Sequence, residues 1–475
     1  MARNIAILAV CSLLQAAGQT TLSQPIPQVP APRTPGYEGP PQFQGSVPAE
    51  SAQPGALPLT LQDAIQRGLK QNLGLIVGDL NTRLAQADRL RSLSVLLPNL
   101  TGRVSDSVQQ INFKALGFNF SVPGIPSVVG PFNVFDARAY FTQSILNFQN
   151  LNRLRSAREN VQASQLTYKD GRDEVVLLVA SGYLQIIADS ARIDEAASEV
   201  ATAQVLYERA ADLLKNGLSP AIDALRAQVE LQNEQTRLRT YRNDFAKDKL
   251  VLARLIGLAA GQEFTLATDL PFQPLENLSL DQALAEAYKT RADYQALQAQ
   301  LRASELTKRA ARAQRYPSIA ANADYGDIGP NPANSHGTMT LSAGVSMTIF
   351  DGGRIRADED QADAELQQRR AQLADLRGQI DAQIRSAFLD LETAADQVAL
   401  ARSSLDLARQ TLEQGRDRFA AGVTDNIEVV QAQNSVASAS ESYINSVFAH
   451  NLAKVTLSRA IGAADTRVQQ YLGGR

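Results

Sequence analysis

The stretch TMTLSAGVSMTIFDGG, residues 338–353, decides the fold of this chain, because it combines a two-faced strand with the start of a helix. Successive side chains of a strand point to opposite faces. Threonine, serine and glycine therefore form one face, and the other face is apolar, with Met339, Leu341, Ala343, Val345, Met347 and Ile349. Phe350-Asp351-Gly352-Gly353 ends the strand, and residues 354–421 follow without a proline.

The segments on either side of this strand predict a hairpin and a very long helix. Residues 319–325 alternate in the same way, and a turn rich in Gly, Pro and Asn joins them to the strand at 338–349. Residues 318–350 are therefore predicted to form a β-hairpin. In 354–421, apolar residues recur by threes and fours, with a full heptad from Val398 to Leu405, which is typical of a coiled coil. At ~1.5 Å per residue this helix is ~100 Å long.

The same order of elements occurs twice. Residues 61–98 recur as 280–317, which is 219 positions on, and Gly217-Leu218-Ser219 recurs as Gly422-Val423-Thr424, 205 positions on. The first repeat is 59–257 with a hairpin at 99–146, the linker is 258–277, and the second repeat is 278–462. In the first hairpin the strand around Phe135, Phe141 and Ile145 alternates well, residues 100–113 alternate poorly, and 114–133 reads as a long loop.

Segment lengths predict how the elements are arranged. A helix at 59–97 and a helix at 221–256, stacked end to end, match one helix of the length of 354–421. Each repeat can then place a long helix beside two shorter ones. The hairpins would lie at one end, and the turns at Gly217 and Gly422 at the other, roughly 100 Å away.

The two ends of the chain look different from the repeats. Residues 1–18 have an apolar run followed by small residues, as in a cleaved signal peptide, although a frayed cytosolic N-terminus is the alternative. Residues 19–58 are rich in Pro, Gln and Gly and are expected to form an extended tether, and 463–475 form a C-terminal tail. Val10 before Cys11 argues against a lipid anchor, because lipoprotein signals usually have a small residue there.

Composition excludes several classes of function. The formal charge is -3 with no large basic patch, which argues against a nucleic-acid partner. One cysteine allows neither a disulfide framework nor a thiolate metal site. After the leader we find no run of ~18 apolar residues of the kind that a membrane helix needs. An exported protein of this sequence would therefore enter a bilayer as strands.

Four strands cannot close a barrel, and an open sheet edge is not tolerated in lipid, so a membrane role requires oligomerisation. The apolar face would then contact lipid through Phe135, Phe141, Ile145, Met339, Leu341, Val345, Met347 and Ile349. The alternative is a soluble sheet with one face on a core, which the long helices would have to cover.

The chain resembles the TolC family of outer-membrane efflux and secretion channels from residue 59 to 462. The resemblance rests on the duplicated halves, the prolines Pro98 and Pro317 at strand entries, residues 350–353, the glycine turns, and the pairs Ala227-Gln228 and Ala432-Gln433. It implies a mainly α fold with a membrane β-barrel portion, in which a homotrimer closes twelve strands above an α-helical tunnel. It also implies a periplasmic adaptor protein, an inner-membrane RND or ABC transporter, and export of small molecules or polypeptides.

The resemblance also implies a gate at the end remote from the membrane, where acidic side chains of the family narrow the entrance. Asp223 and Glu428 each follow a turn glycine by six residues. Three copies would bring six carboxylates together, favouring cations and making closure pH-sensitive. The alternative is that both acids simply suit a helix N-terminus. Gln431 and Thr424 stand where some members carry Asp and Arg, which leaves the bracing of the closed state open.

No enzyme, cofactor or metal site is predicted. His336 and His450 have no second His or Cys near them in the sequence, Asp358-Glu359-Asp360 reads as a solvated helix start, and no Gly-x-Ser-x-Gly motif occurs. A transport duct is the first hypothesis. A non-transporting periplasmic scaffold or adhesin is the second, and the sequence does not identify a cargo.

Overall fold

The computed structural model describes residues 37, 39–48, 51–52, 55–117, 126–267, 272–275, 278–421, 423 and 426–472. The predicted leader, Cys11, most of the predicted tether, Gly422 and Thr424 lie outside these residues.

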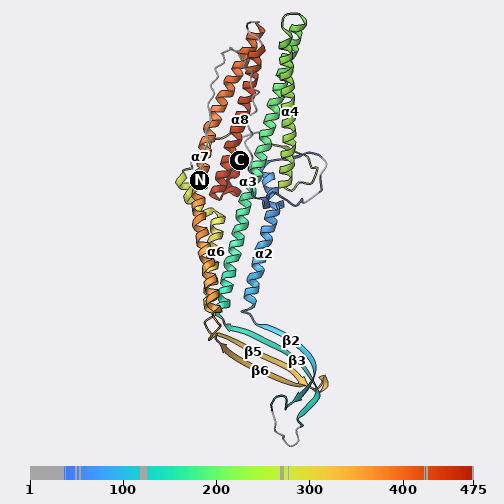
Figure 1. Ribbon diagram of the computed structural model, residues 1–475, viewed down its shortest axis with the longest axis vertical. Helices are drawn as coiled ribbons and strands as arrows, with labels where there is room; N and C mark the ends of the chain where they lie inside the picture. Colours follow the sequence, from blue (N-terminus) through green and yellow to red (C-terminus); the bar gives the residue numbers. More distant parts are fainter. Residues whose placement is uncertain are drawn as a thin grey trace, which may run out of the picture.

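The described chain is a long rod of helices with a sheet at one end (Figure 1). Two helices, α3 (Phe148–Lys215) and α7 (Arg354–Ala420), are 68 and 67 residues long and run along the rod. Shorter helices flank each of them, namely α2 (Leu73–Ser94) and α4 (Ala221–Leu255) beside α3, and α6 (Ala292–Ala313) and α8 (Asn426–Ile461) beside α7. The predicted arrangement of one long helix beside two stacked ones is confirmed, with bounds within two residues for the long helices.

The predicted helix at 59–97 is wrong in one respect, since it is two helices, and its counterpart in the second repeat is divided in the same way. In the first repeat, the short helix α1 (Leu61–Gln71) ends at Asn72, and in the second repeat α5 (Leu280–Thr290) ends at Arg291. The backbone is extended at both Asn72 and Arg291. Neither break contains Gly or Pro, which is why the sequence did not reveal it. Asn72 caps the start of α2 by accepting from the amide of Gly74, and its side chain also donates to the carbonyl of Phe43 in the N-terminal segment.

The coiled-coil periodicity predicted for the long helix is present in its buried residues. Buried side chains of α7 recur every seven residues along two runs, Leu366, Leu373, Ile380, Ala387 and Ala394, then Val398, Leu405 and Leu412. A heptad repeat keeps one stripe facing the partner helix over a long distance. The stripe packs α7 against α6, α5 and α8.

The sheet is antiparallel, in the order β2-β3-β5-β6, with β2 (Asn99–Asn112), β3 (Val128–Leu146), β5 (Ser318–Gly329) and β6 (His336–Ser346). The predicted loop 114–133 is too long, because Val128 and Val129 already pair with β2. A register shift between Gln109 and Ile111 hides this pairing from the alternation pattern. β6 ends at Ser346, so Met347 and Ile349 lie beyond the strand to which the sequence assigned them.

The predicted tether and linker are more ordered than expected. Tyr37 donates to Glu174, and residues 41–43 form a 3-10 helix whose Phe43 packs against the core. β1 (Leu57–Leu59) pairs in parallel with β4 (Phe264–Leu266), which lies inside the predicted linker 258–277. A few apolar side chains in a Pro-rich context suffice to dock these segments, because the middle of the rod offers them a core.

The C-terminal tail is also structured where it is described. α9 (Ala464–Tyr471) packs on α8 and α3, with Ala464, Val468 and Leu472 buried.

Among the described residues, α3 is apolar enough over 18 residues to cross a membrane by length and composition, which corrects the expectation that no such stretch exists. Because 78 % of that window is buried within the protomer, the packing of α3 already explains its apolar character.

Candidate functional site

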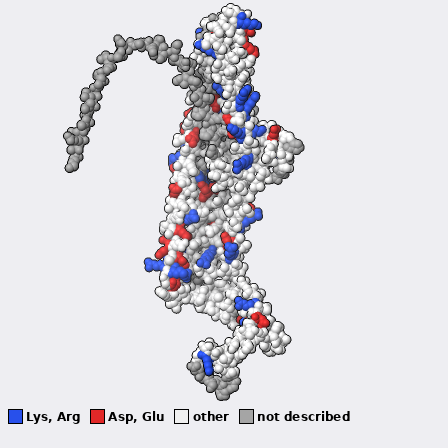
Figure 2. Space-filling model, turned by 45° about the vertical axis from the view of Figure 1, so that its right-hand side comes forward, with Lys and Arg blue, Asp and Glu red and all other residues white. Residues whose placement is uncertain are grey.

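One face of the sheet is apolar and exposed. The strand register aligns Leu100, Phe141, Ala323 and Leu341 in one row across the strands. Phe135, Met339 and Val345 lie on the same face, and Leu341 and Val345 are more than 70 % exposed. Ile145 is exposed at a register shift beside Ser144. Few charged side chains occur over the sheet on the face drawn in Figure 2. An apolar surface of this extent indicates an interaction site.

The other face of the sheet contains a charged cluster that joins the two hairpins. Arg138 of β3 contacts Asp136 at 2.6 Å and Asp324 of β5 at 3.1 Å. Gly326 lies directly opposite Arg138, and a Cβ there would overlap the carbonyl oxygen of Ala137 and lie 2.7 Å from the Cα of Arg138. Glycine at this position therefore allows the backbones of β3 and β5 to approach closely beside the cluster. Polar residues on this face and apolar residues on the other match a membrane strand around an aqueous interior.

The two outer strands of the sheet, β2 and β6, each have one partner in the four-stranded order. Their outer edges carry backbone groups that lipid cannot satisfy. A sheet with one lipid-compatible face and two such edges is an incomplete membrane barrel.

At the far end of the rod, each predicted gate carboxylate has a polar partner in its own helical hairpin. Gly217 adopts a φ of 71° in the turn between α3 and α4. Asp223, in the first turn of α4, accepts from the Ser219 hydroxyl at 2.8 Å. Glu428, in the first turn of α8, pairs with Arg418 at 2.9 Å. A convergence of these acids depends on further copies of the chain, so the gate stays a prediction.

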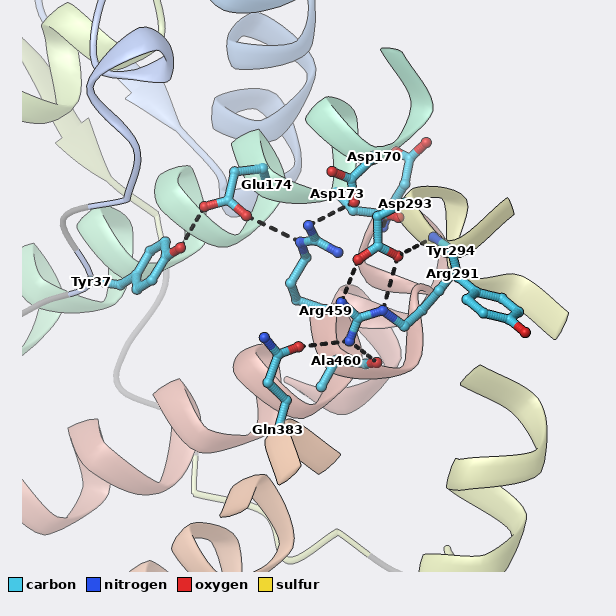
Figure 3. A network of polar contacts seen from close by, with 11 residues as sticks. Tyr37, Asp170, Asp173, Glu174, Arg291, Asp293, Tyr294, Gln383, Arg459 and Ala460 are labelled. Atoms are coloured by element: carbon cyan, nitrogen blue, oxygen red, sulfur yellow. Dashed lines mark hydrogen bonds and ion pairs between the residues drawn. The ribbon is translucent and has the colours of Figure 1, made fainter. Parts of the chain in front are cut away.

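Midway along the rod, two arginines of the second repeat form a polar network, in which Arg459 joins the two repeats and Arg291 joins helices within the second repeat (Figure 3). Arg459 of α8 contacts Asp170 at 2.7 Å and Glu174 at 3.1 Å, both on α3. Arg291, at the break between α5 and α6, contacts Asp293 at 2.6 Å. It also donates to Gln383 of α7 and to the carbonyl of Ala460.

The pKa values in this network reflect burial opposed by the arginines. Burial raises the pKa of Asp170, and Arg459 only partly offsets it. Burial also acts to raise the pKa of Asp293, but the hydrogen bond and charge of Arg291 outweigh it and lower the pKa. Sequence reasoning missed this network. Its one signal was an arginine at position 291, where the first repeat has Asn72.

His450 and the acidic run at 358–360 have structural surroundings. His450 is 1 % exposed and its ring lies 5.1 Å from that of Phe272. Burial, then the charge of Lys454, lowers the pKa of His450 to about 4. Asp358 and Glu359 accept hydrogen bonds from Gln314 and Arg315. No group of three or more His, Cys, Asp or Glu that could hold a metal occurs among the described residues.

These features define the class of the protein: one protomer of a membrane channel, with an open strand sheet and a long helical extension. The chain belongs to the outer membrane efflux protein family, whose sequence profile matches residues 65–258 and 283–463. The two matched stretches correspond to the two repeats.

Individual relatives are distant but match over most of their length. The chain is 22 % identical to the toluene efflux pump outer membrane protein TtgC of Pseudomonas putida, over 85 % of this chain and 82 % of that protein. It is 24 % identical to the pyoverdine export outer membrane protein OpmQ of Pseudomonas aeruginosa, over 97 % and 96 %. The crystal structure of the Campylobacter jejuni CmeC outer membrane channel matches with a TM-score of 0.75 at 16 % identity, over 94 % and 97 %.

The predicted family, fold class and location are thereby confirmed. The protein is an outer-membrane efflux channel component whose helical body extends into the periplasm.

Proposed function

We propose that three copies of this chain close a twelve-stranded barrel and form the exit duct of a tripartite efflux system. The observation that carries this proposal is the four-stranded sheet with unpaired outer edges and an exposed apolar face. Pairing β6 of one copy with β2 of the next satisfies both edges.

In this assembly the apolar face contacts lipid. Phe135, Phe141, Ile145, Met339, Leu341 and Val345 lie in the bilayer, and the Arg138 cluster lines the water-filled interior. Met347 and Ile349, 57 % and 92 % exposed beyond the end of β6, lie at the boundary between barrel and helices.

Exposed leucines on the helices support contacts between copies. On α2, Leu73, Val77, Leu80 and Leu84 are exposed and spaced by fours and threes. On α7, Leu400 and Leu407 are exposed and one heptad apart. Such stripes are typical of coiled-coil seams that lack their partner.

The duct is passive, with no enzymatic activity of its own, and it acts with a periplasmic adaptor protein and an inner-membrane RND or ABC transporter. Relatives named for toluene efflux and pyoverdine export favour small molecules over polypeptides as cargo. Specificity would reside in the transporter.

Fractionation tests the duct against the alternative of a scaffold or adhesin. We expect the protein in the outer membrane, released by detergent but not by salt, and migrating as a trimer that forms channels in planar bilayers. A soluble periplasmic protein, or a membrane-bound one without conductance, would contradict the proposal.

The gate can be tested in the same bilayers. Converging carboxylates at Asp223 and Glu428 would favour cations, so the double change to Ala should raise conductance and lower cation selectivity. Asp79→Ala is the control, because Asp79 forms an exposed pair with Arg83 on α2, away from the tip. Equal currents in the double variant and the control would contradict the gate.

A further inference from the structure

Between the middle of the rod and its tips, three carboxylates are buried where α3 and α4 meet α8. Glu199 of α3 is 6 % exposed, and Glu230 and Glu234 of α4 are 7 % and 3 % exposed. Glu199, Arg237 and Glu441 line a cavity of about 20 Å³ here. Burial of several acids in helical packing is costly unless each is paired or protonated.

Most charges at this junction are paired. Glu234 contacts Arg237 at 2.9 Å, and Arg192 contacts Asp189 at 2.7 Å and Glu441 of α8 at 3.0 Å. Among the described residues, Glu199 makes neither a hydrogen bond nor an ion pair.

The charged groups around Glu199 lie on α3, α4 and α7, and Glu441 of α8 lines the same cavity. Glu195 of α3, paired with Arg409 of α7 at 3.4 Å, and Glu234 of α4 are like charges. Arg237 of α4 and Arg416 of α7 are opposite charges at longer range. Burial, then Glu234 and Glu195, raises the pKa of Glu199 to about 7, and the two arginines only partly offset this.

We propose that Glu199 is a proton-sensitive latch, which holds the α3–α4 hairpin closed against α8 when protonated and destabilises this junction when ionised. The latch is a property of the helical body and goes beyond the proposed duct, since hairpin closure can be measured whether or not the protein conducts.

The sign and size of the effect follow from linkage. The closed junction binds the Glu199 proton more tightly than an open, solvated one, so closure is favoured as pH falls and weakened as pH rises. With a pKa of about 7 when closed and the ordinary 4.5 when open, the opening constant increases about tenfold from pH 6 to pH 8.

Amide hydrogen exchange on the full-length protein in detergent tests this latch. Exchange in α3 around Glu199 and in α4 around Glu234 is compared at pH 6 and pH 8, after correction for the intrinsic effect of pH. In the wild-type protein, the opening constant of the junction should be about tenfold larger at pH 8 than at pH 6. Burial also raises the pKa values of Glu230 and Glu234, so Glu199→Gln should exchange slowly at pH 6 and lose most, though not all, of the pH dependence. Glu208→Gln, at an exposed site on the same helix, should behave as wild type.

Glu234→Gln is a second variant, which removes a repelling charge but keeps the titrating group. Glu234→Gln should lower the ratio of corrected exchange rates between pH 8 and pH 6 without abolishing the difference. This variant can be measured even where Glu199→Gln does not fold. Equal corrected exchange in wild type at the two pH values, or an undiminished pH dependence in Glu199→Gln, would overturn the latch. Loss of conductance without these changes would bear on the duct alone.

Discussion

The ends of α4 and α8 carry equivalent residues in different surroundings. Lys249, Arg254 and Gly257 recur 205 positions on as Lys454, Arg459 and Gly462. Lys249 is half-buried, with its amine 4.7 Å from the centre of the Phe264 ring, and Arg254 is exposed. Lys454 is 1 % exposed, and burial lowers its pKa to about 8.

The difference arises from where the two helices pack. α4 lies mainly beside α3, whereas α8 packs against α7, α3 and α9 (Figure 1). Repetition of sequence therefore does not repeat the environment. In the second repeat the arginine is part of a buried network, and in the first it is a solvated helix end.

Replacing the arginines tests this contrast with the largest expected effect. Arg459→Ala should cost about 3–5 kcal/mol of unfolding free energy, because Asp170 and Glu174 lose a buried partner. Arg254→Ala, the matched control, should cost less than about 0.5 kcal/mol. Denaturant unfolding of the detergent-solubilised protein, followed by circular dichroism, measures both. Equal losses of unfolding free energy in the two variants would show that the ends of α4 and α8 are equivalent.

A second contrast concerns acid sensitivity. His450 has Phe245 as its counterpart. Because burial lowers the pKa of His450 from 6.5 to about 4, acid favours the unfolded state, which binds the proton first. Stability should be unaffected above pH 6.5 and fall below it, by about 3 kcal/mol at pH 4, relative to His450→Phe.

Unfolding of both proteins at pH 7, 5 and 4 gives this difference directly. A difference that stays constant across the three pH values would contradict a buried neutral imidazole. Phe245→His is the converse control and should add little pH dependence, since position 245 is only half-buried.

The smallest contrast involves the glycines after α4 and α8. Both have positive φ, 70° at Gly257 and 80° at Gly462. A Cβ at Gly462 would lie 2.7 Å from the Cα of Arg291, and one at Gly257 would lie 2.5 Å from the Cβ of Gln71, which side-chain rotation cannot move. Gly462→Ala and Gly257→Ala should therefore each cost about 2–3 kcal/mol of unfolding free energy, from the positive φ and the close contact together. Thermal unfolding measures both losses, and a loss below about 1 kcal/mol at either position would contradict this prediction.

Much of the fold was predictable because its signals are local. Alternation at 338–346, the heptads of α7 and the turn glycine Gly217 lie in short stretches of sequence, and they determine strand, helix and turn. The candidate site was predictable only in part. The apolar strand face followed from alternation, but the Arg138 cluster depends on pairing with Asp324, 186 residues away.

The sequence by itself determined the duplication, the element lengths and the two-faced strands, since periodicity and repeat spacing are properties of the chain alone. Tertiary structure decided the helix breaks at Asn72 and Arg291, the docking of Tyr37 and Phe43, and the full burial of Lys454, whose equivalent Lys249 is only half-buried. Each of these depends on which distant helix lies alongside, because burial and hydrogen-bond partners are set by packing and not by neighbours in the chain.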